Sequence, residues 1–419
     1  MRIKTLLIVF LYIFFFIIFI ATFNDRKEVK TGSEKIKYWG VQSIDTVKYS
    51  RDLAREKLND SGFEKDIDKQ VELIASTGTT HVAVGTPYDT EFTPFLRNWI
   101  RAARKYGLKV WFRGNLSGWE EWFGYERITR EQHTQKILDF IKNNEDLFED
   151  GDIFTSCTEC ENGGPGDPRM TGDISGHRNF LISEYKATTA AFKALGKNVQ
   201  SNFMSMNGDV ANLIMDKTTT RELGGIVVVD HYVKSSEGLA NDLVKLSEKS
   251  GGRIVLGEFG APVLDIHGNM SERSQAQWIY NTLLAISEVP SIVGVNYWTS
   301  VGGSTGIWDE DYTAKEAVEV LKKFYGPRLV EGRVKNEAGE AVQDVEIISG
   351  PQMVLTDSQG RFAFAAVSKN YKVAFTKNGY FTKQIDINDR YSLEVVLSKE
   401  NENLFYKLRK IINSNIKLR

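Results

Sequence analysis

The chain has 419 residues, of which 42% are hydrophobic and 26% are charged, and its 53 basic and 55 acidic side chains give a net charge of −2. The apolar content excludes an intrinsically disordered protein, and the balanced charge argues against a protein that coats nucleic acid. Two cysteines are too few for a disulfide framework or a four-cysteine zinc site, and the length allows two or three domains.

An apolar run with the sequence LLIVFLYIFFFIIFIAT occupies residues 6–22, and basic residues flank it on both sides. As a helix it would rise about 25 Å, which is enough to cross a thin hydrocarbon core. A cleaved signal peptide is the alternative, but only Ala21 and Thr22 offer the small side chains of a cleavage site. We therefore predict an uncleaved signal anchor and linker over residues 1–35. The rest of the chain would lie outside the cytoplasm at the cell surface, or be secreted if the segment is cleaved.

Eight short apolar runs alternate with longer amphipathic stretches between residues 37 and 325. The Val and Ile content of the runs is typical of buried parallel strands, and the stretches between them have helical spacing. Eight strand–helix units in about 290 residues predict an α/β fold of the (β/α)8 TIM-barrel type over residues 36–327. A doubly wound open sheet is the rival, but no Gly-x-Gly-x-x-Gly turn follows the first run. The predicted strands are 37–44, 80–85, 108–114, 152–159, 198–203, 225–232, 253–259 and 291–298.

Carboxylates, amides and aromatic side chains gather at the carboxyl ends of these runs, where a barrel has its active site. Aromatic faces stack on sugar rings, and amides and carboxylates bind hydroxyl groups, so this composition predicts a carbohydrate site. The five histidines are scattered without metal-ligand spacing, so we predict neither a metal nor a cofactor. The candidates are Arg113, Asn115, Trp119, Glu159, Glu161, His231, Tyr232, Glu258 and Trp298.

Two glutamates, one after the fourth strand and Glu258 in the seventh, would face each other across the barrel mouth. Two carboxyl groups about 5 Å apart are the arrangement of a retaining glycosidase, in which one is the acid/base and the other the nucleophile. Glu258 follows a run that is expected to be buried, so its carboxylate needs partners. His231 and Tyr232 on the adjacent strand are positioned to supply them.

The segment Gly257-Glu258-Phe259-Gly260 resembles the nucleophile motif of clan A glycoside hydrolases, such as the family 5 cellulases and mannanases. The resemblance implies a retaining mechanism with Glu258 as the nucleophile. It also implies that the His231–Tyr232 pair orients this nucleophile and that Trp298 forms a platform under the scissile sugar. Arg113 and Asn115 would help to hold the sugar, and Trp119 is a further subsite candidate.

The resemblance departs from the clan at the fourth strand. The clan has Asn-Glu there, whereas this chain has Thr158-Glu159-Cys160-Glu161. Glu159 is the preferred acid/base because the run before it has the expected length. Glu161 is the alternative, since an extended strand would aim both side chains into the mouth. Cys157 and Cys160 flank the acid and are compatible with a local disulfide or with two buried thiols.

After residue 327 the apolar pattern changes to a period of two, which predicts a small all-β sandwich over residues 328–398. The segments 332–334 and 356–362 resemble the carboxypeptidase regulatory-like (transthyretin-like) module, which implies adhesion, spacing or carbohydrate contact. Residues 399–419 contain six basic and two acidic side chains with helical apolar spacing. This tail is compatible with an amphipathic helix on a membrane surface, with a helix packed on the sandwich, or with a solvated tail.

Together these features predict a membrane-anchored, extracytoplasmic retaining glycoside hydrolase that acts on a β-linked poly- or oligosaccharide. A non-catalytic, cell-surface glycan-binding protein on the same barrel is the alternative, because the fourth strand lacks the Asn of the clan. Carbohydrate and membrane are the expected partners, and nucleic acid is not.

Overall fold

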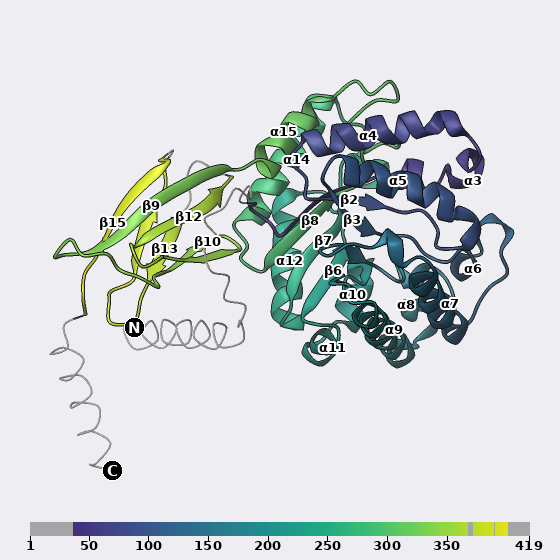
Figure 1. Cartoon of the computed structure of the whole chain (residues 1–419), viewed down its shortest axis with the longest axis horizontal. Helices are drawn as coiled ribbons and strands as arrows, with labels where there is room; N and C mark the ends of the chain where they lie inside the picture. The colour runs from purple at the N-terminus through teal and green to yellow at the C-terminus, as the bar shows by residue number, and fades with distance from the viewer. Residues whose placement is uncertain (1–36, 368–371, 389, 401–419) are drawn as a thin grey trace, which may run out of the picture.

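The computed structural model describes residues 37–367, 372–388 and 390–400, which form an α/β barrel and a β sandwich side by side (Figure 1). The predicted anchor at residues 6–22 and nearly all of the basic tail lie outside this part of the chain. Among the residues described, no helix is both long and apolar enough to cross a membrane. Membrane anchoring therefore stays a prediction.

Eight parallel strands form the barrel, in the order β4-β3-β2-β1-β8-β7-β6-β5. A parallel bridge between Ile153 and Gln200 brings the two ends of this sheet together. The predicted α/β barrel is thus confirmed. Its strands are β1 (Val41–Asp45), β2 (His81–Val84), β3 (Lys109–Phe112), β4 (Ile153–Phe154), β5 (Ser205–Asn207), β6 (Ile226–Asp230), β7 (Arg253–Phe259) and β8 (Ile292–Tyr297).

Helices cover the outer side of these strands (Figure 1). In α4 the side chains of Ile67, Val71 and Ile74 lie on the buried face, as their spacing predicts. The start of α7 is fixed by a capping box between Thr129 and Gln132. The longer helices are α4 (Glu64–Ser76), α5 (Thr93–Lys105), α7 (Arg130–Asn143), α9 (Ile174–Ala194), α10 (Gly208–Ile214), α11 (Lys217–Glu222), α12 (Ser236–Ser250), α14 (Glu272–Ser287) and α15 (Glu316–Tyr325). Short helices are α2 (Val47–Ser50), α3 (Ala54–Lys57), α6 (Ser117–Glu120), α8 (Pro168–Thr171) and α13 (Leu264–His267), with 3-10 turns η1 (Ser61–Phe63), η2 (Thr90–Phe92), η3 (Trp122–Gly124), η4 (Glu145–Leu147) and η5 (Cys160–Asn162).

Two predicted strands are wrong in their extent. The fourth ends at Phe154 and not at residue 159, because the chain bends after Thr155, whose hydroxyl donates to the Phe203 carbonyl at 2.7 Å. The fifth is residues 205–207, whereas in the predicted range 198–203 Gln200 makes the isolated bridge to Ile153. Both differences lie where β4 and β5 approach each other, and where a side-chain hydrogen bond from Thr155 joins the two segments in place of regular backbone pairing.

A cluster of apolar side chains fills the inside of the barrel. Trp111 and Phe203 meet edge to face with ring centroids 5.3 Å apart, and Val41, Val228 and Val255 pack in the same cluster. A second, larger core lies between strands and helices. Since the inside of the barrel is packed, polar chemistry is confined to the strand ends and to the loops that follow them.

The β sandwich follows directly after α15. One sheet has the order β11-β10-β13-β14 and the other β12-β9-β15, and alternating apolar residues such as Val330 and Val334 fill the space between them. Ala365 and Val367 join the apolar core of the barrel, so the two units are in contact. The predicted β domain is confirmed, while its resemblance to the carboxypeptidase regulatory-like module stays a prediction. The strands are β9 (Arg328–Asn336), β10 (Glu346–Ser349), β11 (Gln352–Leu355), β12 (Arg361–Ala366), β13 (Lys372–Thr376), β14 (Lys383–Asp386) and β15 (Ser392–Leu397).

Asp152, just before β4, ties this short strand to β3 and α5. Its buried carboxylate pairs with Arg104 (Nη1–Oδ1 2.9 Å) and accepts a hydrogen bond from the Val110 amide at 2.9 Å. We expect Asp152→Ala to lower the free energy of unfolding by about 3 kcal/mol or more, because it leaves buried donors without an acceptor. Chemical denaturation measures this change. Glu149→Ala is the control: Glu149 contacts the same Arg104 at 3.4 Å but is 52% exposed, so its loss is expected to cost below about 1 kcal/mol. Equal losses in the two variants would contradict the role given to Asp152.

Candidate active site

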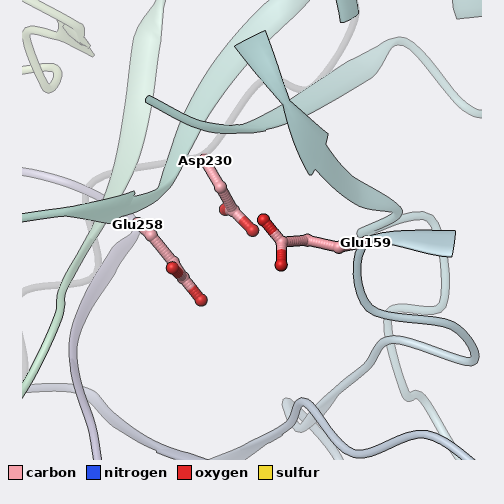
Figure 2. A group of neighbouring side chains, drawn as sticks. All are labelled: Glu159, Asp230 and Glu258. Atoms are coloured by element: carbon pink, nitrogen blue, oxygen red, sulfur yellow. The ribbon is translucent and has the colours of Figure 1, made fainter. Parts of the chain in front are cut away.

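Three carboxyl groups meet at the carboxyl ends of the barrel strands. Glu258 lies in β7, Asp230 ends β6, and Glu159 lies in the turn that follows β4. Figure 2 shows the three side chains pointing toward a common centre, and one oxygen of each lies within 4.8 Å of the others. Carboxylates from distant parts of the sequence therefore share one small space.

Arg113, directly after β3, is the cation of this cluster. Its Nη2 atom lies 2.7 Å from Oε1 of Glu258 and 3.1 Å from Oδ2 of Asp230, and its Nε atom lies 3.5 Å from Oδ2 of Asp45. The guanidinium also donates to the Gly257 carbonyl. The side chain is only 2% exposed, so the prediction that Arg113 holds the sugar is wrong: its donors are used by carboxylates beneath the mouth.

Glu258 is held by two donors. Arg113 binds one carboxylate oxygen, and the Tyr232 hydroxyl donates to the other at 2.9 Å. Burial and the charge of Asp230 raise the pKa of Glu258, and Arg113 opposes the rise. Both donors stabilise the ionised carboxylate.

The two residues predicted to orient Glu258 differ in the structure. Tyr232 contacts it as expected. The ring of His231 instead pairs with Asp242 (Nε2–Oδ2 3.2 Å), and only the His231 backbone amide bonds the Glu258 carbonyl, at 3.0 Å. The predicted side-chain contact between His231 and Glu258 is therefore wrong. On the strand end Asp230-His231-Tyr232, the aspartate and the tyrosine face the site and the histidine between them does not.

Glu159 occupies a tight turn in the left-handed region, with φ 46° and ψ 56°. A disulfide joins Cys157 to Cys160 and so brackets the residue. The Glu159 amide donates to the Ser205 carbonyl at 3.0 Å, and its carboxyl accepts from the Asn162 side chain at 3.0 Å. Burial, then the charges of Glu258 and Glu161, raise the pKa of Glu159 to about 8. These surroundings favour the protonated form of the carboxyl.

Glu161 lies apart from the three carboxyls. It is buried in η5, where Oε1 accepts from the backbone amide of Asn207 at 2.6 Å and from its side chain at 3.0 Å. The sequence argument that both glutamates aim into the mouth assumed an extended strand. Because the strand ends at Phe154, Glu159 and Glu161 point to different neighbours, and Glu159 is the one that approaches Glu258.

Asn115 and Trp119 are buried supports and do not contact the mouth. The Asn115 carbonyl oxygen pairs with Nε2 of His133 at 3.0 Å, and only 1% of the residue is exposed. Trp119, also 1% exposed, stacks on Phe180 with centroids 5.0 Å apart and donates its indole N–H to the Cys160 carbonyl at 3.1 Å. The prediction that these two residues bind sugar is wrong, because the loops after β3 and β4 pack against each other and enclose them.

Trp298, directly after β8, stays partly exposed near Tyr232 and Glu258. Its ring meets Tyr232 edge to face with centroids 6.1 Å apart, and the Lys48 ammonium lies 5.2 Å from the ring centroid. This position is compatible with the predicted sugar platform.

Asp45, Asp230 and Asn296 lie in the site without a predicted role. Asn296 on β8 donates to Oδ2 of Asp45 at 3.2 Å and to the Gly257 carbonyl at 2.8 Å. The signal was present in the segment IVVVD at 226–230, where a carboxylate ends a strand that is expected to be buried. The prediction for Glu258 rests on the same signal.

The spacing of the three carboxyls is also one at which a cation could bind. Here the Arg113 guanidinium already supplies the positive charge to two of them. A divalent cation in the same space would be repelled by it, so we assign no metal to the site.

Comparison with known proteins shows the fold. No family model matches the chain, and no curated protein sequence matches it. Among solved structures, a GH5_18 protein from Streptomyces cattleya in complex with Manβ1-4GlcNAc is 14% identical, with a TM-score of 0.52 over 71% of this chain and 84% of that one. A GH5_18 protein from Bifidobacterium longum is 13% identical, with a TM-score of 0.49 over 72% and 84%. A β-glucuronidase from Bacteroides uniformis is 12% identical, with a TM-score of 0.44 over 80% of this chain, which spans only 44% of that enzyme. The likeness to the Streptomyces cattleya structure shows that the two proteins share the barrel fold.

The raised pKa of Glu159 has a consequence for stability. Its carboxyl has a pKa near 4.5 when unfolded and about 8 when folded, so between these values the folded protein binds a proton that the unfolded chain does not. Its contribution to stability therefore falls as pH rises through this window. We expect Glu159→Gln to change stability little at pH 5 and to raise the free energy of unfolding by on the order of 2–4 kcal/mol at pH 9.

Denaturation of both proteins at several pH values measures this difference. Glu126→Gln, at an exposed glutamate of the same barrel, is the control and is expected to show no such trend. A stability difference for Glu159→Gln that does not vary with pH would contradict the environment assigned to this carboxyl.

Proposed function

We propose that this protein is a retaining glycoside hydrolase in which Glu258 is the nucleophile and Glu159 the acid/base. The observation that carries the proposal is that one oxygen of Glu159 and one oxygen of Glu258 lie within 4.8 Å of each other at the barrel mouth. Retaining enzymes hold their carboxyls roughly 5 Å apart, whereas inverting enzymes need about 6.5–9.5 Å to admit a water molecule.

The surroundings of the two carboxyls support this division of roles. Glu258 receives hydrogen bonds from a guanidinium and a phenol, which favour the ionised form that attacks carbon. Burial and the neighbouring carboxylates favour the protonated form of Glu159, and only one neutral amide, that of Asn162, donates to it. A proton shared between the two would therefore reside on Glu159.

The reaction follows from these states. The Glu258 carboxylate attacks the anomeric carbon while the bond to the leaving oxygen breaks and that oxygen takes the proton of Glu159. The ionised Glu159 then removes a proton from water, whose oxygen attacks the same carbon and releases Glu258. Arg113 and Tyr232 stay bound to Glu258 and orient it, while Trp298 would lie under the sugar ring.

A β-linked poly- or oligosaccharide is the proposed substrate class, in keeping with the resemblance of the GEFG segment to clan A enzymes. Residues 6–22 would anchor the protein at the outer face of a membrane, and the basic tail is a second candidate contact. The β sandwich would then act as a spacer or an additional carbohydrate contact.

A non-catalytic glycan-binding protein is the second candidate. It is favoured by the absence of the Asn that the clan has before its acid. In this chain that position is Thr158, whose hydroxyl donates to the Arg113 carbonyl at 2.9 Å. Binding without turnover across a set of β-glycans would support this candidate.

Activated β-glycosides distinguish the roles of the two glutamates. We expect Glu258→Gln to abolish hydrolysis of both 4-nitrophenyl and 2,4-dinitrophenyl glycosides, because neither can react without the nucleophile. Glu159→Gln is expected to lose about 10²–10⁴-fold in kcat/KM on natural oligosaccharides, including Manβ1-4GlcNAc, yet to form the glycosyl-enzyme normally from 2,4-dinitrophenyl glycosides, whose leaving group needs no proton.

Glu161→Gln is the matched control, since Glu161 is two residues from the acid and bonds Asn207. It is expected to keep the leaving-group dependence of the unmodified protein. If Glu161→Gln, and not Glu159→Gln, lost kcat/KM on natural oligosaccharides but still reacted normally with 2,4-dinitrophenyl glycosides, the assignment of Glu159 as the acid would be wrong.

A further inference from the structure

Asp230 is a third carboxyl in the site, and a two-glutamate mechanism gives it no task. Its side chain is fully buried, and one oxygen, Oδ2, lies 3.1 Å from the Arg113 guanidinium. The other oxygen, Oδ1, accepts no hydrogen bond from the described residues. Figure 2 shows the Asp230 carboxyl turned toward that of Glu159. A buried oxygen without a donor is costly, so its position calls for a reason.

The neighbouring strand is shaped to admit this carboxyl. Gly257, immediately before Glu258, faces Asp230 across the β6–β7 pair, and a Cβ at residue 257 would collide with Oδ1. Any larger residue at 257 would displace the Asp230 carboxyl. The segment Gly257-Glu258 thus places the nucleophile and makes room for Asp230 at the same time.

The charges around Glu159 do not balance if every carboxyl is ionised. Arg113 makes ion pairs with Asp45, Asp230 and Glu258 but none with Glu159. If the cluster retains one proton, Glu159 is the carboxyl that holds it most readily, because Glu159 makes no ion pair with Arg113. The charged groups that face Glu159 are Arg113 from β3, Glu120 from α6, Glu161 from η5, Asp230 from β6 and Glu258 from β7.

We propose that Asp230 is a positioning residue that keeps the proton on Glu159 by holding a buried carboxylate, paired with Arg113, within 4.8 Å of it. The effect of Asp230 on reaction rate rests on the proposed function. Its effect on the proton of Glu159 does not, because the two carboxyls lie together whether or not a substrate is bound. Burial, opposed by Arg113 and reinforced by Glu159, raises the pKa of Asp230 as well, so the two carboxyls compete for a proton. The ion pair with Arg113, which Asp230 has and Glu159 lacks, favours the ionised form of Asp230.

Asp230 would serve both halves of the reaction. Before the first step the charge of Asp230 keeps Glu159 protonated, and the leaving oxygen needs this proton. After that proton has left, the same charge makes the ionised Glu159 a stronger base toward water. Arg113, held by Asp230 on one side and by Glu258 on the other, meanwhile stays fixed to the nucleophile.

Asp230→Asn tests the proposal, because it keeps the shape and removes the charge. We expect the alkaline limb of the kcat/KM–pH profile, which reports loss of the Glu159 proton, to move to lower pH by about one unit or more. A merely structural role would lower activity without moving this limb. Asp45→Asn is the matched control, since it also removes a carboxylate paired with Arg113 but not one of the three that meet at Glu159. Its alkaline limb is expected to stay in place.

A second readout needs no activity. The infrared carbonyl band of a protonated carboxyl is assigned to Glu159 by its loss in Glu159→Gln, and its pH titration is compared in the unmodified protein and in Asp230→Asn. A lower midpoint in Asp230→Asn supports the proposal, and an unchanged midpoint overturns it. If Asp230→Asn does not fold, Asp230→Ser removes the same charge with a smaller side chain. Absence of hydrolysis in the unmodified protein would count against the proposed function and leave this titration valid.

Discussion

The buried guanidinium of Arg113 is the interaction on which the site depends. It joins carboxylates from three other strands, namely Asp45 on β1, Asp230 on β6 and Glu258 on β7. Buried carboxylates on neighbouring strands would repel one another without it, and the strand ends could not close around them. Because one cation faces more than one anion, the cluster is left with a net negative charge. Glu159 makes no ion pair with Arg113, and burial, followed by the charges of Glu258 and Glu161, raises its pKa.

The barrel produces this arrangement from elements far apart in the sequence. The packed apolar interior, with Trp111 at its centre, forces polar residues to the strand ends, where eight strands converge on a small area. The turn after β4 adds the fourth carboxyl from the opposite side, fixed by the disulfide between Cys157 and Cys160 and by the Ser205 carbonyl. The strands thus hold Glu258 on regular backbone, whereas the position of Glu159 depends on a short irregular turn.

The sequence was sufficient for the parts that follow from periodicity, namely eight strand–helix units, the β sandwich and the placement of Glu258 in β7. It was insufficient where tertiary contacts decide which way a side chain faces. Asn115 and Trp119 follow a strand end, as sugar-binding residues would, but loop packing encloses them. Likewise, the prediction that Arg113 donates to sugar fails because a sequence does not show that carboxylates from other strands already use its donors. Glu159 and Glu161 were expected to face the same side because alternate residues of an extended strand do so. This expectation fails for Glu161 because the strand ends at Phe154, earlier than its composition indicates.

Trapping of the covalent intermediate tests the two-glutamate mechanism most directly. The protein is incubated with a panel of 2,4-dinitrophenyl 2-deoxy-2-fluoro-β-glycosides, in which the fluorine slows both steps and the good leaving group keeps the first step faster than the second. We expect the intact mass to increase by one fluorosugar and the label to lie on the peptide that contains Glu258, at the side chain held by Arg113 and Tyr232. Turnover of the parent glycosides without any labelled protein, or a label on Glu159 or Glu161, would contradict the assignment of Glu258 as the nucleophile.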